Sequence, residues 1–86
     1  MPEICRFYGI IIRMFYDDHN PPHFHAFYGD DEALININTL AVFAGGIPAR
    51  ALGLVVEWAS MHQNELRRDW ELARNQQKPD MIEPLK

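Results

Sequence analysis

The first half of the chain alternates hydrophobic and polar positions with a period of two, which is the repeat of a β-strand. The segment 5–16, CRFYGIIIRMFY, is rich in aromatic and β-branched residues and contains no proline, so it predicts one strand. We expect its even positions to face the core: Tyr8, Ile10, Ile12, Met14 and Tyr16. Arg13 then points to the opposite face of the sheet.

A turn and a second strand follow. The segment 17–22, DDHNPP, combines Asp, Asn and proline, the residues that turns favour. The segment 23–28, HFHAFY, then alternates again and predicts a strand. One face of that strand carries His23, His25 and Phe27.

Two more strands are predicted in the first half. A hairpin turn at 29–32, GDDE, leads into a third strand at 33–39, whose isoleucines face inward. Asn36 and Asn38 lie on its outer face. The segment 40–46, LAVFAGG, predicts a short fourth strand that ends at a glycine pair.

The second half has the spacing of an amphipathic helix. Pro48 suits the first helical turn, and the segment 48–75 carries apolar residues at steps of three, four and seven. These are Leu52, Val55, Val56, Ala59, Leu66, Trp70 and Ala73. One helix of this length would be about 40 Å long, longer than so small a domain is wide. We therefore expect a break at 61–64, or a C-terminal arm that reaches a second subunit in a homodimer.

These elements predict one α+β domain over 1–86. Its N-terminal half, with strands within 5–44, forms a three- to four-stranded antiparallel sheet. One long or broken C-terminal helix over 48–75 packs against this sheet, and the tail 76–86 is extended, with Met81, Ile82 and Leu85 as its docking groups.

Composition narrows the classes of protein. The net charge of −4 argues against a general nucleic-acid binder, because phosphate affinity depends on clustered Lys and Arg. Cys5 is the single cysteine, which excludes an intramolecular disulfide and a thiolate metal cage. The sequence shows neither a signal peptide nor the about 20 continuous apolar residues of a membrane span. We expect a cytoplasmic protein with no membrane partner.

The histidines of HNPPHFH, residues 19–25, are candidate metal ligands. His23 and His25 share one strand face, and His19 in the turn is a possible third ligand beside the oxygen donors of DD at 17–18. Zinc sites with an open position use three such ligands and a water molecule. The spacing permits a divalent metal such as zinc without being diagnostic of one. No other cofactor is expected.

The same histidines also suit catalysis without a metal. His23 and His25 can serve as general base and general acid, and Arg13 can stabilise negative charge. This requires Arg13 to lie near His23 across a strand pair, with Asn36 and Asn38 lining the same face. A third alternative is purely structural, with the imidazoles bonded within the turn and strand. The residues alone leave all three open.

Longer motifs carry a resemblance that covers almost the whole chain, from Pro2 to Leu85. The chain contains RFYGIIIRMFYDDHNPPHFHA, then RALGLVVEWASMHQNEL, WELA and a terminal IEPL. It thereby resembles a family of short bacterial proteins catalogued as domain of unknown function 4160. The resemblance implies a compact α+β protein encoded in two-gene cassettes similar to toxin–antitoxin operons. It implies no proven activity for the histidines.

The function expected from these observations is that of an interaction protein in a toxin–antitoxin-like pair. It would bind a small partner protein from the adjacent gene through a sheet edge or the C-terminal helix. One alternative is a metal-independent ribonuclease-like toxin that uses His23 and His25 with Arg13. The other is a small metal-binding protein.

Overall fold

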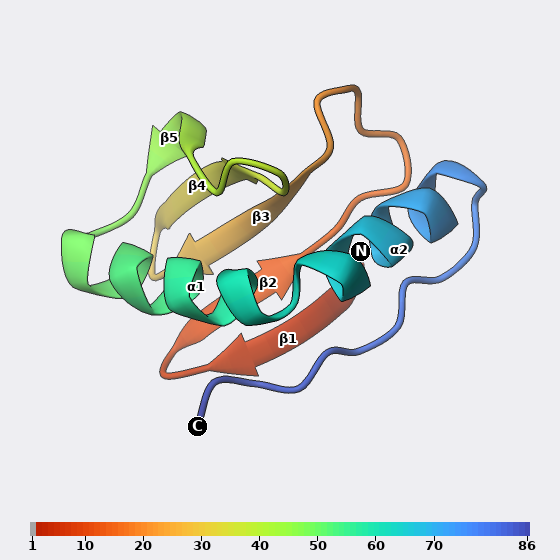
Figure 1. The fold of residues 1–86 in the computed structure, drawn as a ribbon. Helices are drawn as coiled ribbons and strands as arrows, with labels where there is room; N and C mark the ends of the chain where they lie inside the picture. Colours follow the sequence, from red (N-terminus) through yellow and green to blue (C-terminus); the bar gives the residue numbers. More distant parts are fainter. Residues whose placement is uncertain (1) are drawn as a thin grey trace.

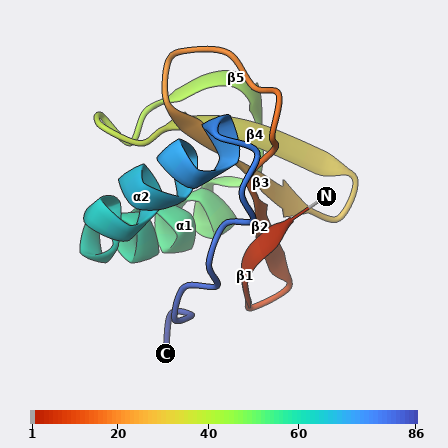
Figure 2. The same ribbon diagram turned by 90° about the vertical axis from the view of Figure 1, so that its right-hand side faces the viewer.

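A computed structural model describes residues 2–86, which form a five-stranded antiparallel sheet and two helices (Figure 1). The strands lie in chain order, β1-β2-β3-β4-β5, and both helices cover one face of the sheet (Figure 2). The elements are β1 Glu3–Phe7, β2 Ile10–Arg13, β3 His23–Tyr28, β4 Asp31–Asn36, β5 Val42–Gly46, α1 Ala49–Met61 and α2 Gln63–Arg74. The α+β class is confirmed, but the sheet has more strands than predicted and the helical region consists of two helices.

The predicted single strand at 5–16 is a hairpin. The chain reverses at Tyr8 and Gly9, which have φ values of 49° and 79°, and β1 then pairs with β2. Tyr8 is 60% exposed instead of buried. Gly9 adopts its positive φ without a steric penalty, whereas a positive φ is unfavourable for Tyr8. The strand pattern on both sides concealed this turn. The remaining even positions are buried: Ile10, Ile12 and Met14 fully, and Tyr16 in part.

The other predicted strands are confirmed with shifted ends. β3 has the predicted bounds, whereas β4 begins at Asp31, inside the predicted hairpin turn, and ends at Asn36, earlier than the predicted third strand. The Asn36 side-chain oxygen accepts hydrogen bonds from the backbone N–H groups of Asn38 and Thr39, at 2.8 and 3.0 Å. This local turn ends the ladder. Ile35 and Ile37 are buried as predicted, and Ala33 is buried on the same face.

The expected break in the helical region is present. α1 ends at Met61, His62 leaves helical geometry at φ −130°, and α2 begins at Gln63. The second helix stays on its own domain, where Leu66 and Trp70 are buried, so it is not an arm that extends from the domain. The domain measures 33 × 26 × 22 Å, too short for an unbroken helix of about 40 Å. Within residues 2–86, neither helix is long and apolar enough to cross a bilayer.

Trp58 of α1 is the centre of the core between helix and sheet. Its side chain is fully buried and lies 5.5 Å from the ring of Phe7 and 5.9 Å from the ring of Phe24, between ring centroids. Its Nε1 donates a hydrogen bond to the Glu83 carbonyl at 2.8 Å. One side chain therefore connects α1, two strands and the C-terminal tail.

The tail is extended, as predicted, and lies along the edge of β1. The Ile82 amide donates to the Ile4 carbonyl at 2.8 Å, and the Ile82 side chain is buried. Leu85 packs against the core as expected, whereas Met81 is 65% exposed and does not dock. The tail thus covers an edge strand that would otherwise present unpaired backbone groups.

Asp69 of α2 is a buried carboxylate that holds the start of this tail. Its Oδ1 accepts a hydrogen bond from the Asp80 amide at 2.9 Å, and its Oδ2 has no partner among residues 2–86. Burial raises the pKa of Asp69 from 3.8 to about 6, and the bond from Asp80 opposes this shift. The protonated side chain therefore fits the folded state better than the charged one.

Asp69→Asn is expected to change how stability depends on pH. Because the folded pKa is the higher one, the contribution of Asp69 is fully present below pH 3.8 and is lost as the pH rises through about 6. The variant should be about 1–3 kcal/mol more stable than wild type at pH 8, and this difference should shrink toward pH 4. Urea unfolding at both pH values measures this, with Glu71→Gln, which removes an exposed carboxylate from the same helix, as control. A constant difference between Asp69→Asn and wild type at all pH values would contradict the expectation.

Candidate functional site

The candidate site lies at the start of β3, where histidines alternate with core residues. Phe24 and Ala26 are fully buried, so His23 and His25 project from the opposite side of the strand. Both histidines are nevertheless covered, at 4% and 8% exposure. The ring of His23 contacts those of Phe43 and Trp70, and the ring of His25 contacts that of Phe15, at centroid distances of 4.3–5.3 Å.

A carboxylate from the preceding turn joins the two imidazoles. Oδ2 of Asp18 lies 2.9 Å from Nε2 of His25 and 3.2 Å from Nε2 of His23. The three potential ligand atoms all lie within 4.8 Å of one another. The site therefore brings two nitrogen donors and one oxygen donor to a single point.

The other ring nitrogens are fixed by hydrogen bonds. Nδ1 of His23 lies 2.7 Å from the Pro21 carbonyl oxygen, which can only accept, so this nitrogen carries the proton. Nδ1 of His25 lies 2.7 Å from Oε2 of Glu32 on β4 and donates to it. With the proton on Nδ1, Nε2 of a neutral imidazole has a lone pair. The hydrogen bond of 2.9 Å between Nε2 of His25 and Oδ2 of Asp18 needs a second proton on that ring. Bonds from Nδ1 to a carbonyl or carboxylate are what orients metal-binding histidines.

Two lone pairs and a carboxylate oxygen facing one another repel unless a cation lies between them. That cation is either a proton on one imidazole or a bound metal ion. Nε2 of His23 is buried and has no hydrogen-bond partner among residues 2–86, although it lies near Asp18. In a tetrahedral zinc site with bonds of about 2.0–2.1 Å, ligand atoms are about 3.3 Å apart. The distances from Oδ2 of Asp18 to the two Nε2 atoms, 3.2 and 2.9 Å, are close to that value.

His19 does not join this group. It is exposed in the turn, and Asp18 supplies the third donor in its place. The Asn20–Pro21 peptide in this turn is cis. The alternation of β3 was enough to predict that His23 and His25 share one face of the strand. The turn at 17–22 has no regular repeat, so the sequence did not show which of its residues faces them.

Arg13 lies opposite His25 in the β2–β3 ladder, and not opposite His23 as the catalytic alternative required. Its guanidinium carbon lies 5.2 Å from the centroid of the Phe27 ring, and its Nε is buried without a partner among residues 2–86. Arg13 is thus placed beside the cluster, with its guanidinium over an aromatic ring.

The asparagines predicted to line the same face have other roles. Asn36 lies opposite His23 in the ladder, but its side chain caps the turn after β4. Asn38 accepts a hydrogen bond from Nε of Arg67 on α2, at 2.9 Å. Neither side chain lines the site.

Glu32 was not identified from the sequence as a partner of His25, although the spacing of the β3–β4 hairpin places the two residues near each other. The turn at Gly29 pairs Tyr28 with Asp31, so the next pair is Phe27 with Glu32. Glu32 then lies on the face that carries His25, one diagonal step away, within reach of a long side chain.

The cluster opens onto a hollow of about 390 Å³. Its lining residues are Pro2, Phe15, Tyr16, Asp17, Asp18 and His25. Asp18 and His25 thus belong both to the cluster and to the wall of a space that a small ligand can enter.

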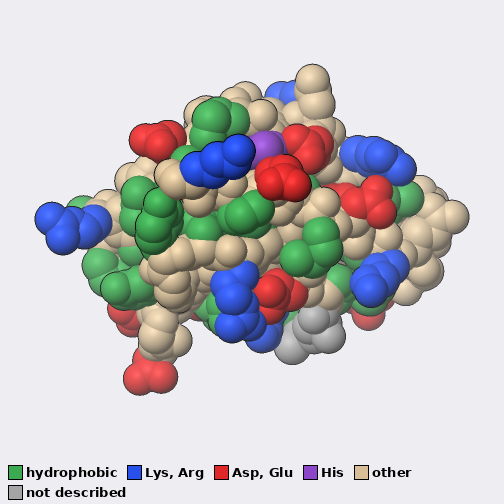
Figure 3. Space-filling view, turned by 90° about the horizontal axis from the view of Figure 1, so that it is seen from below, with side chains coloured by type: hydrophobic (Ala, Val, Ile, Leu, Met, Phe, Trp, Pro, Cys, Tyr) green, Lys and Arg blue, Asp and Glu red, His purple; other side chains and the backbone are tan. Residues whose placement is uncertain are grey.

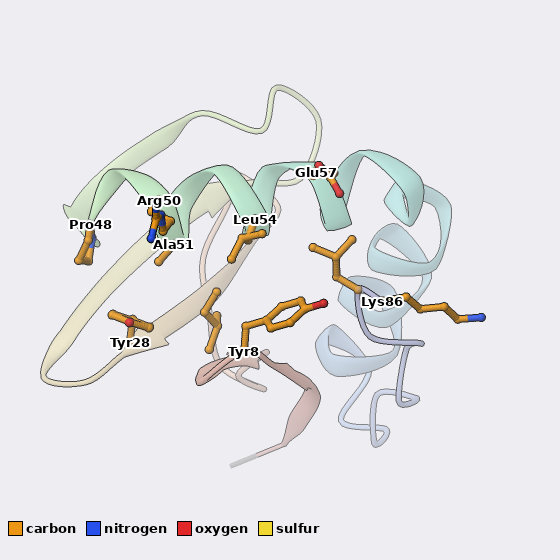
Figure 4. A pocket seen from close by; sticks show the side chains of 10 residues that line it. Tyr8, Tyr28, Pro48, Arg50, Ala51, Leu54, Glu57 and Lys86 are labelled. Carbon is orange, nitrogen blue, oxygen red and sulfur yellow. The ribbon is translucent and has the colours of Figure 1, made fainter.

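A larger hollow, of about 590 Å³, lies between α1 and the β1–β2 hairpin (Figure 4). Tyr8 and Leu54 point into it, and Arg50, Glu57 and Lys86 supply its charges. Hydrophobic side chains also gather in the middle of the face seen in Figure 3, with charges of both signs around them. The described residues that line the 590 Å³ hollow include no histidine or cysteine, so we place the candidate chemistry at the cluster on β3.

Comparison with known proteins gives a family. The searches of curated proteins and of solved structures gave no match. A family model described as a domain of unknown function (DUF4160) matches residues 9–71, which include Asp18, His23, His25 and Glu32. The match is shorter than the expected resemblance from Pro2 to Leu85, and it leaves out β1, the end of α2 and the tail. Because the match covers well over half of the chain, this protein belongs to the DUF4160 family.

Proposed function

We propose that this protein binds one divalent transition-metal ion through Oδ2 of Asp18, Nε2 of His23 and Nε2 of His25. The observation that carries this proposal is the convergence of both Nε2 atoms on one carboxylate oxygen, while both Nδ1 atoms are fixed by acceptors. Three ligand atoms held in this way repel one another unless a cation, either a proton or a metal ion, lies between them.

The donor set also favours a class of metal. Two imidazole nitrogens and one carboxylate oxygen suit zinc, cobalt, nickel and iron(II). Calcium and magnesium prefer all-oxygen sites with more ligands. We therefore expect zinc or a neighbouring transition metal, and no selective binding of magnesium.

Metal-free acid–base catalysis has less support. A general base needs a nitrogen that faces the substrate, but both Nδ1 atoms are bonded and both Nε2 atoms point at Asp18. The guanidinium of Arg13 lies over Phe27, and the net charge of −4 disfavours an RNA substrate. The ribonuclease-like alternative is accordingly secondary.

Titration of untagged protein with zinc tests the proposal. Calorimetry should give one equivalent, and His23→Ala or His25→Ala should weaken binding by at least about 100-fold, since even the partners of metal ligands are worth 10–100-fold. His19→Ala is the matched control, because it removes an exposed imidazole from the same turn and should leave affinity unchanged. A wild-type protein that binds no zinc, or a His19→Ala variant as weak as the other two, would contradict it.

The wider role expected from the family resemblance is compatible with a metal site. A protein-interaction component of a toxin–antitoxin-like two-gene module, in a bacterial cytoplasm, remains a prediction. So do the partner protein from the adjacent gene and the homodimer.

A further inference from the structure

We infer that the bound metal keeps an exchangeable coordination position, that this position opens onto the 390 Å³ hollow, and that it takes a neutral aromatic nitrogen donor of the imidazole type. This inference rests on the proposed metal binding and adds the class of ligand. It follows from the number of donors, the side on which they are accessible, and the chemistry of the walls.

The number of donors leaves a position free. Among residues 2–86 the group consists of three side chains, whereas closed structural zinc sites use four. Glu32 does not supply the fourth, because its carboxylate is bonded to Nδ1 of His25, on the far side of the ring from Nε2. The remaining position therefore belongs to water or to an external ligand.

The accessible side is the one that faces the hollow. The ring of His23 is enclosed by the rings of Phe43 on β5 and Trp70 on α2. Asp18 and His25, in contrast, both line the hollow. An external ligand thus approaches past these two residues and not past His23.

The walls select a flat, uncharged ligand. Phe15 and Tyr16 provide aromatic surface, and Phe15 already contacts the imidazole of His25 edge-on at 4.3 Å. The charged residues among the lining are Asp17 and Asp18, both acidic. With a divalent ion bound to Asp18, the remaining carboxylate of the lining is that of Asp17, and the lining offers no Lys or Arg to bind a phosphate group. An imidazole ring can bind the metal and still make edge-to-face contacts with these walls.

The size of the hollow fits this class. Ligand pockets commonly measure about 300–1,000 Å³, so this one lies near the lower limit and suits a single ring. The ring can come from a free heteroaromatic compound or from a histidine side chain of another protein. The chemistry at the metal is the same in both cases.

Visible absorption of the cobalt(II)-loaded protein tests the inference. Imidazole should change the cobalt bands with saturation at a concentration at least ten times lower than inorganic phosphate requires, while the cobalt content after desalting stays constant. Acetyl-histidine amide is a second probe: binding tighter than that of imidazole indicates a polypeptide source, and equal binding indicates a free compound.

Asp17→Lys provides the matched variant, because Asp17 is exposed and is not one of the three ligands. The positive charge of the lysine should lower the concentration of phosphate that saturates the cobalt bands, and so bring it closer to the concentration of imidazole. Cobalt bands that neither probe shifts would show a closed site and overturn the inference alone, as would tighter binding of phosphate by wild type. Failure to bind cobalt at all would overturn the proposed metal binding as well.

Discussion

Trp58→Ala is expected to lower the free energy of unfolding by about 3–5 kcal/mol, the usual cost of removing a large buried aromatic side chain. Trp58 is fully buried between α1 and the sheet, against Phe7 and Phe24. Domains have a total stability of about 0.05–0.15 kcal/mol per residue, so this loss is a large share of the whole for a chain of 86 residues. The variant should be partly or fully unfolded at 37 °C.

Two further variants separate packing from hydrogen bonding. Trp58→Phe keeps an aromatic ring but loses the bond to the Glu83 carbonyl, so its cost should be intermediate. Met61→Ala, at an exposed position near the end of the same helix, should have little effect. Guanidinium unfolding followed by circular dichroism gives all three values. A cost below 1 kcal/mol for Trp58→Ala would show that the core does not depend on this side chain.

The elements that could be predicted from the sequence are those governed by local periodicity. Alternation in 23–28 gave the bounds of β3, and the thinning apolar stripe at 61–64 gave the break between the helices. The hairpin inside 5–16 was missed because both of its strands are apolar, and the turn consists of only two residues, Tyr8 and Gly9. A periodicity of two does not distinguish one strand from two short ones joined by a tight turn.

At the site, too, local periodicity predicted some of the residues, and tertiary structure determines the others. His23 and His25 share a side of β3 because of strand geometry alone. The choice of Asp18 over its neighbour His19 depends on how the turn folds back toward the strand. The role of Glu32 depends on the β3–β4 register, which brings it to Nδ1 of His25. Sequence spacing therefore identified the imidazoles, whereas their carboxylate partners are set by tertiary structure.

Zinc is expected to raise the melting temperature of the wild-type protein by about 10–20 °C when its free concentration is about 100 times the dissociation constant. At that ratio, a ligand that binds only the folded state stabilises it by about 2.7 kcal/mol. Each kcal/mol shifts the melting temperature of a domain of 60–100 residues by about 4–8 °C. His25→Ala should abolish the shift, since it removes one of three ligands.

The effect of Glu32→Ala on this shift distinguishes a prepared metal site from adventitious binding to imidazoles. Glu32 touches no metal in the proposed site but holds Nδ1 of His25 at 2.7 Å, and loss of such a partner weakens affinity by about 10–100-fold. At the same zinc concentration, about half of the shift or less should remain. Asp31→Ala is the control, because Asp31 is exposed and adjacent, and points to the other face of β4. A shift that persists unchanged in Glu32→Ala, or in His25→Ala, would mean that zinc binds elsewhere on the folded chain.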